Sequence, residues 1–264
     1  MTSHRSASNS PTPGLTASAR VSQARPFYAD YAEAYDLLVT GPVEPWADAV
    51  HDRLLAGGWP SAHVLDAGCG TGRHAAALAA KGHHVDLADA SERLLAQAAA
   101  RNPSALALHA DLCALIVSGA YQAVTCRGVL NDMTTVAERD AALSSLRGAL
   151  SDGGVLMLDV REPEGSRRRA DGVPRHRTAD LGPRGALELA STVTWEAGFL
   201  HVVEDYQLRT PSSPAEHRRF HFIMRPWSAQ EIRERLTAAG FGRVDVGPGV
   251  GRTTGDRLFV VAQL

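Results

Sequence analysis

The stretch Val64-Leu65-Asp66-Ala67-Gly68-Cys69-Gly70-Thr71-Gly72 decides the fold, because it combines a short apolar strand with a glycine-rich turn. Glycines at positions 68, 70 and 72 let the backbone turn sharply and approach a ligand closely. The turn leads into a predicted helix over residues 73–81, and a helix N-terminus favours a carboxylate or a phosphate. The glycines alternate, so the dinucleotide pattern Gly-x-Gly-x-x-Gly is not present, and Asp66 places an acid before the first of them.

Strand and helix patterns alternate on both sides of this turn. We expect five strands at residues 63–66, 85–88, 105–109, 123–126 and 155–160. Thr135 and Glu138 predict the start of the helix after the fourth strand, as a capping box. Repeated strand–helix units predict an α/β fold with a doubly wound, mostly parallel sheet.

The pattern changes after residue 160. Residues 191–195, 200–208 and 218–224 alternate polar and apolar side chains, which predicts an antiparallel β insertion after the fifth strand. A helix starting at Ser228 and strands at 242–246 and 257–263 then complete a seven-stranded sheet.

The composition indicates a single soluble catalytic domain. The 264 residues are 44% hydrophobic and carry a net charge of −2, so a polyanion is not the expected main partner. The three cysteines have no paired spacing, which favours a reducing, cytoplasmic location over a disulfide framework. No apolar run reaches the roughly 18 residues of a membrane span, so we expect no membrane partner. The sequence is compatible with a homodimer.

The segment from Asp66 to Gly72 resembles motif I of class I S-adenosylmethionine-dependent methyltransferases, and the order of elements matches from about Tyr28 to the C-terminus. The resemblance implies a Rossmann-like methyltransferase fold with S-adenosyl-L-methionine as cofactor. It implies that Asp89 holds the ribose hydroxyls and that Asp111 lies against the adenine amine, although each could simply cap a helix or turn. The implied cofactor-binding residues are Tyr28, Asp66, Gly68, Cys69, Gly70, Thr71, Gly72, Arg73, Asp89, Ala90, Asp111, Leu112 and Cys126.

Four segments follow from this assignment. Residues 1–26 are expected to be a disordered tail, because they are rich in Ser, Thr, Ala and Pro and contain no acid. Residues 27–160 form the cofactor-binding core, with N-terminal helices that fold over the cofactor as a lid. Residues 161–227 form the antiparallel insertion that covers the substrate, and residues 228–264 end the core.

The candidate acceptor site follows the fourth and fifth strands, because ligands bind outside the carboxyl ends of such sheets. We expect Asn131 and Asp132 to orient the nucleophile; otherwise they begin the next helix. Tyr35 is a third catalytic candidate, with core packing as its alternative. The expected substrate-binding residues are Tyr31, Arg161 and His221. His217 and His221 have a helical metal spacing but lie in a predicted strand, so no metal is expected.

The leading hypothesis is methyl transfer to a small-molecule amine in bacterial specialised metabolism. The insertion resembles the covering sheet of bacterial N-methyltransferases that act on amino sugars and similar amines. O-methylation of a hydroxyl is an alternative, but a clear base for it is not identified. RNA methylation is a second alternative, through an arginine-rich loop made of Arg167, Arg168, Arg169, Arg175 and Arg177. A non-catalytic cofactor-binding protein is the third.

Overall fold

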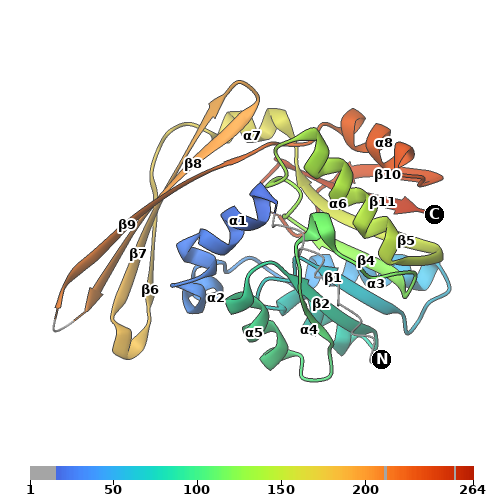
Figure 1. The fold of residues 1–264 in the computed structure, drawn as a ribbon, viewed down its shortest axis with the longest axis horizontal. Coiled ribbons are helices and arrows are strands. Elements are labelled where there is room, and N and C mark those ends of the chain that lie inside the picture. Colours follow the sequence, from blue (N-terminus) through green and yellow to red (C-terminus); the bar gives the residue numbers. More distant parts are fainter. Residues whose placement is uncertain (1–15, 211–212, 253) are drawn as a thin grey trace, which may run out of the picture.

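The computed structural model describes residues 16–210, 213–252 and 254–264 and has a seven-stranded sheet at its centre (Figure 1). The strand order is β10-β11-β5-β4-β1-β2-β3. The first five strands along the chain pair in parallel, and β11 runs antiparallel to both β5 and β10. The predicted doubly wound sheet is therefore confirmed. The strands are β1 (His63–Ala67), β2 (His84–Asp89), β3 (Ala107–His109), β4 (Tyr121–Arg127), β5 (Leu150–Arg161), β10 (Arg243–Pro248) and β11 (Arg257–Gln263).

Helices cover both faces of this sheet. Buried residues of α3, α4 and α5 pack with one set of strand side chains, which includes Val64. Buried residues of α6 and α8 pack with the alternate set, which includes Leu65. Thr135 and Glu138 form the predicted capping box at the start of α6. The helices are α3 (Glu44–Ala56), α4 (Arg73–Ala80), α5 (Glu92–Arg101), α6 (Val136–Ala149) and α8 (Ala229–Ala238).

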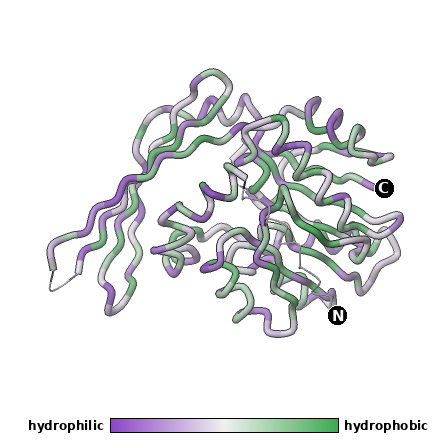
Figure 2. Tube along the Cα trace, viewed as in Figure 1, coloured by the Kyte–Doolittle hydropathy of each residue, from purple (hydrophilic) through white to green (hydrophobic). Residues whose placement is uncertain are grey.

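The insertion is a separate four-stranded antiparallel sheet of order β6-β7-β8-β9, which follows the short helix α7 (Pro163–Arg169). Three of its strands match the predicted ones, and β6 lies in the arginine-rich segment. The strands of the seven-stranded sheet are mostly hydrophobic, whereas the end of β9 that lies farthest from that sheet is hydrophilic (Figure 2). We call this sheet the cover sheet; its strands are β6 (Arg175–Asp180), β7 (Ala186–Glu196), β8 (Phe199–Thr210) and β9 (Ser213–Met224).

The N-terminal segment lies between the core and the cover sheet (Figure 1) and corrects two predictions. Residues 17–24, expected to be disordered, form helix α1 (Ala17–Ala24), because core carboxylates bind its first turn: Ser18 N donates to Glu138 Oε1 at 2.9 Å. The expected lid helix is instead two 3₁₀ turns and a short helix, at Pro26–Tyr28, Ala32–Ala34 and Tyr35–Leu38 (α2). The rest of the predicted tail, residues 1–15, lies outside the described residues.

Among the described residues, no helix combines the length and the apolar character that crossing a membrane requires.

Candidate functional site

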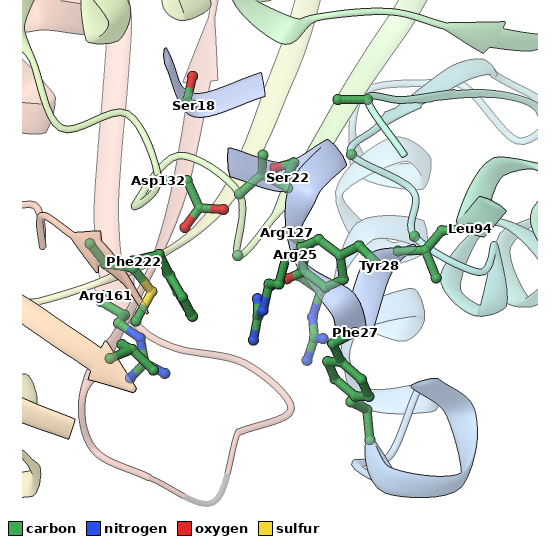
Figure 3. A pocket seen from close by; sticks show the side chains of 18 of the residues that line it. Ser18, Ser22, Arg25, Phe27, Tyr28, Leu94, Arg127, Asp132, Arg161 and Phe222 are labelled. Atoms are coloured by element: carbon green, nitrogen blue, oxygen red, sulfur yellow. The ribbon is translucent and has the colours of Figure 1, made fainter. Parts of the chain in front are cut away.

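A cavity of about 360 Å³ lies at the carboxyl ends of the central strands, between the sheet, the N-terminal segment and the cover sheet. Asp132, Phe222 and Arg161 lie on one side of it and Tyr28 on the other, with the guanidinium groups of Arg25 and Arg127 between them (Figure 3). The cavity is therefore built by three parts of the chain that are far apart in the sequence.

The strand order arranges the polar residues in a line along this edge of the sheet. Asp111 follows β3, Asp89 ends β2, and the glycine turn with Gly70 follows β1. Asp132 follows β4 and Arg161 ends β5. Because β3, β2, β1, β4 and β5 are neighbours in that order, the cavity has a glycine-rich half over β1–β3 and an acceptor half over β4–β5.

The glycine turn leaves room for a ligand at one position and forbids a side chain at another. Gly68 has a φ of 77°, and a Cβ there would overlap with the side chain of Val129. Gly70 has a φ of 56°, but the nearest atom to its Cβ would be Tyr35 Oη at 4.0 Å. Gly70 therefore faces the open cavity, whereas Gly68 is held against the loop after β4.

The two carboxylates of the glycine-rich half have free accepting capacity. Asp89 accepts hydrogen bonds from Gly70 N and Ser91 N, each at 2.8 Å, and burial raises its pKa to about 6. Asp111 accepts from Cys113 N and Thr16 N, each at 2.9 Å. Each carboxylate oxygen has a second lone pair, so both residues can still accept bonds from ribose hydroxyls and an adenine amine.

The predicted cofactor-binding residues separate into two groups. Seven line the cavity: Tyr28, Gly68, Gly70, Asp89, Ala90, Asp111 and Leu112. The others support the turn from behind. Asp66 is buried and accepts from Thr125 Oγ1 at 2.8 Å, and burial raises its pKa to about 6. Cys69 and Cys126 are buried, and Gly72 packs against Asn102 and Ala98.

Two further cofactor predictions are corrected because the side chains have other partners. Thr71 Oγ1 donates to Asp36 at 2.6 Å. The guanidinium of Arg73 donates to the carbonyl oxygens of Val39 and Gly41, so it fixes the loop after α2 and does not line the cavity.

Asn131 and Asp132, predicted to act together, have different environments. Asn131 is fully buried; its Oδ1 accepts from Arg161 N at 2.8 Å and its Nδ2 donates to Gly128 O at 3.2 Å. Asn131 thus braces the loop to β5 with both atoms of its amide, and it does not line the cavity. Asp132 lines the cavity, and burial raises its pKa to about 6 against the opposing effect of nearby arginines, Arg25 foremost.

The other predicted acceptor residues are only partly brought together. Tyr35 and Arg161 line the cavity. Tyr31 is buried against Tyr206 and donates to Glu216, because the turn after Tyr28 directs it toward the cover sheet. His221 is also outside the cavity: it stacks on His201, with 5.6 Å between ring centroids, on the sheet face opposite the cavity-lining residues of β9.

Arg25 and Glu204 were missed by the sequence prediction and join the N-terminal segment to the cover sheet. Arg25 forms a bidentate ion pair with Glu204 and donates to Tyr28 Oη at 2.6 Å. Its guanidinium lies 4.4 Å from the ring centroid of Tyr28 and 4.3 Å from that of Phe222. The composition around Arg25 is typical of disorder, so the sequence holds no signal for its role. Glu204 lies in a strand of alternating polar and apolar residues, and that pattern could have predicted that its side chain points inward.

Positive charge exceeds negative charge on the acceptor side. Arg161 and Arg169 both pair with Asp256. A second pair of arginines, Arg252 in the β10–β11 loop and Arg257 on β11, shares Asp159. All four arginines line the cavity together with Arg127, and three aspartates, Asp132 included, oppose these five positive charges.

Comparison with known proteins agrees with this geometry. Residues 64–154 match a family described as "Methyltransferase domain". A dTDP-3-amino-3,6-dideoxy-alpha-D-glucopyranose N,N-dimethyltransferase of Streptomyces fradiae is 32% identical over 139 residues, which are 50% of this chain and 54% of the relative. The match thus spans about half the length of that curated relative.

Solved structures extend the similarity over nearly the whole chain. An S-adenosylmethionine-bound amino pentose methyltransferase from Micromonospora echinaspora, involved in calicheamicin biosynthesis, has a TM-score of 0.71 at 26% identity and covers 89% of this chain and 97% of its own. A sugar N-methyltransferase from Streptoalloteichus has a TM-score of 0.71 at 20% identity, covering 100% and 98%. The second similarity, at its lower identity, supports the fold alone.

Proposed function

We propose that this chain, a member of the class I S-adenosylmethionine-dependent methyltransferases, methylates the amine of a small molecule, and specifically of an amino sugar. The observation that carries the proposal is Asp132, a cavity-facing carboxylate at the acceptor end of an enclosed pocket. The relatives that share the fold and part of the sequence act, by their names, on amino sugars.

The enclosure of the cavity supports a small acceptor. Ser18 of α1, Leu189 of β7 and Val202 of β8 all line it, so the N-terminal segment and the cover sheet both close over the strand ends. The RNA alternative is disfavoured because the loop offers few free cations to a phosphate backbone. Arg168 and Arg175 are exposed but already pair with Glu164 and Asp171, and Arg169 and Arg177 line the cavity.

The chemistry of Asp132 favours an amine over a hydroxyl. When bound, S-adenosylmethionine supplies a methyl group on a sulfonium, which a neutral amine can attack directly. With a pKa of about 6, Asp132 is ionised at neutral pH, accepts a hydrogen bond from the amine N–H and can take up the proton that the methylated nitrogen releases. An alcohol is a far weaker acid and requires a stronger base than this carboxylate.

The other cavity residues position the acceptor and exclude water. Tyr28 and Tyr35 form part of the wall between the glycine turn and the acceptor half. The ion pair of Arg25 with Glu204 joins the N-terminal segment to the cover sheet over this wall. Holding the amine in line with the methyl group in a dry cavity accounts for most of the catalysis expected here.

The arginine excess supports an acceptor that carries a phosphate or diphosphate group, as the substrate named for the Streptomyces fradiae relative does. Ser166 of α7 adds a buried hydroxyl that lines the cavity and has no hydrogen-bond partner among the described residues. A doubly charged group would neutralise the excess and occupy these donors.

A turnover screen tests the proposal by measuring release of S-adenosylhomocysteine. The acceptors are dTDP-linked amino sugars, the corresponding free amino sugars, phenols and carboxylates. We expect turnover with the amines, highest for the dTDP-linked forms, and at least about a tenfold loss in Asp132→Asn. Asp140→Asn is the matched control, because Asp140 is on the exposed side of α6 and pairs with Arg235. Turnover with phenols alone would refute amine methylation.

A further inference from the structure

A guanidinium without a carboxylate partner lies beside the glycine turn. Arg127 ends β4 and lines the cavity, and the hydrogen bond that its Nη2 donates to Gly251 O is long, at 3.4 Å. Its neighbour Arg252 and the next arginine, Arg257, are both paired with Asp159. Among the described residues Arg127 forms no salt bridge. An unpaired, largely buried cation is costly, so a ligand is expected to bring the missing negative charge.

Unpartnered nitrogens gather around this side chain. Three of the buried side-chain atoms without a hydrogen-bond partner in the described part of the chain are Arg127 Nε, His74 Nε2 and Trp46 Nε1. The Arg127 guanidinium lies 5.6 Å from the ring centroid of Trp46. Buried polar atoms in folded proteins nearly always have a partner. Of these three residues only Arg127 lines the cavity, so a ligand in the cavity can supply the missing partner of Arg127 Nε.

His74 is an uncharged neighbour of Arg127. It is the second residue of α4, directly after the glycine turn. Burial, together with the positive charges of Arg127 and Arg252, lowers its pKa to about 3. The pKa of Arg127 is lowered to about 10, again mainly by burial, so Arg127 stays charged at neutral pH. The site therefore offers the guanidinium of Arg127 close to the N-terminus of α4, a combination that suits a carboxylate.

We propose that Arg127 binds the carboxylate of the methionine part of S-adenosylmethionine. The order of residues along the sheet supports this assignment. Asp111 and Asp89 accept the adenine and the ribose over β3 and β2, so the methionine part extends past Gly70 toward β4, where Arg127 lies. Arg73, one of the cofactor-binding residues that the sequence predicts, does not line the cavity and is therefore less suited to this contact. The inference depends on the cofactor and not on the identity of the acceptor.

Binding of two cofactor fragments to the full-length protein tests the assignment. S-adenosylhomocysteine carries the aminocarboxypropyl group, whereas 5′-methylthioadenosine has the same adenosine and thioether without it. By calorimetry, Arg127→Met should weaken S-adenosylhomocysteine by about tenfold or more, the loss expected for bonds to a charged group. The affinity for 5′-methylthioadenosine should stay within about twofold, since that ligand does not reach Arg127. Arg73→Met is the matched control and should change neither affinity.

The outcomes separate the alternatives. Equal weakening of both ligands in Arg127→Met would mean that Arg127 only shapes the pocket, and unchanged affinities would place the carboxylate elsewhere; each result overturns the proposal. Selective weakening in Arg73→Met would return the role to Arg73. If Arg127→Met does not fold, Arg127→Lys decides, because lysine keeps the charge but not the planar, bidentate geometry of the guanidinium. We expect a smaller but still selective loss of S-adenosylhomocysteine, and a loss shared by both ligands, or none, would refute the site.

Discussion

The ionised carboxylate of Asp132 should lower the free energy of unfolding of the protein. Burial raises its pKa from 3.8 to about 6, with Arg25, Arg161 and Arg257 opposing the rise. The folded state therefore binds a proton more tightly than the unfolded state, and stability falls as the pH rises from about 4 to about 6. Above pH 6 the charged form carries the whole cost, up to roughly 3 kcal/mol for a pKa rise of this size.

Asp132→Asn removes this charge with little change in shape. We expect the free energy of unfolding at pH 8 to increase by about 2 kcal/mol, below the full value because the side chain partly faces the cavity and its water. At pH 4 the wild-type carboxyl is already protonated, so the difference should nearly vanish. Turnover should nevertheless fall, because the amide cannot take up a proton.

Urea unfolding of both proteins at pH 4, 6 and 8 measures this effect. Asp140→Asn is the control, since its half-exposed carboxylate should give a small change with little dependence on pH. A difference between Asp132→Asn and wild type that is the same at all three pH values, or a loss of stability at pH 8, would refute the reasoning.

Three further expectations follow from the cofactor half. Gly70→Ala should lose only the roughly 1–2 kcal/mol that a positive φ costs, because its Cβ meets open space, and it should lose S-adenosylhomocysteine binding in calorimetry, because that Cβ fills space in the cavity. Gly68→Ala should lower the melting temperature clearly, because its Cβ overlaps with Val129. Asp89→Ala should weaken the cofactor by about 1.5–3 kcal/mol in the same assay; an unchanged affinity would move the ribose contact elsewhere. A chain starting at Pro26 should lose both thermal stability and cofactor affinity, since it lacks α1; retention of both would show that α1 is dispensable.

The central fold could be predicted because its signals are local and repeated. Each strand–helix unit shows its own periodicity, and the parallel order then fixes which strand ends share an edge. The resemblance implies Asp89 and Asp111 as cofactor residues, and the fold brings both to the cavity because Asp89 ends β2, Asp111 follows β3 and the two strands are neighbours. Side-chain direction was not needed for that inference.

Predictions that depended on side-chain direction or on distant partners did less well. Tyr31 is predicted to bind the substrate, but the chain turns after Tyr28, and Tyr31 packs on Tyr206. Helix α1 forms in a segment whose composition indicates disorder, because Glu138 and Asp111 supply partners from more than ninety residues away. Tertiary contacts of this kind override local propensity and leave no local signal.

Asn131 and Asp132 show how the acceptor site is built from adjacent residues with opposite roles. The amide of Asn131 accepts from the backbone of Arg161 on β5 and donates to Gly128, which ties the loop after β4 to the neighbouring strand. This brace fixes the backbone from which Asp132 points into the cavity. A buried amide satisfied on both of its atoms is suited to that task, whereas a carboxylate there would repel its own loop carbonyl. Asn131 therefore anchors the loop, and Asp132, the next residue, is the group proposed to face the acceptor.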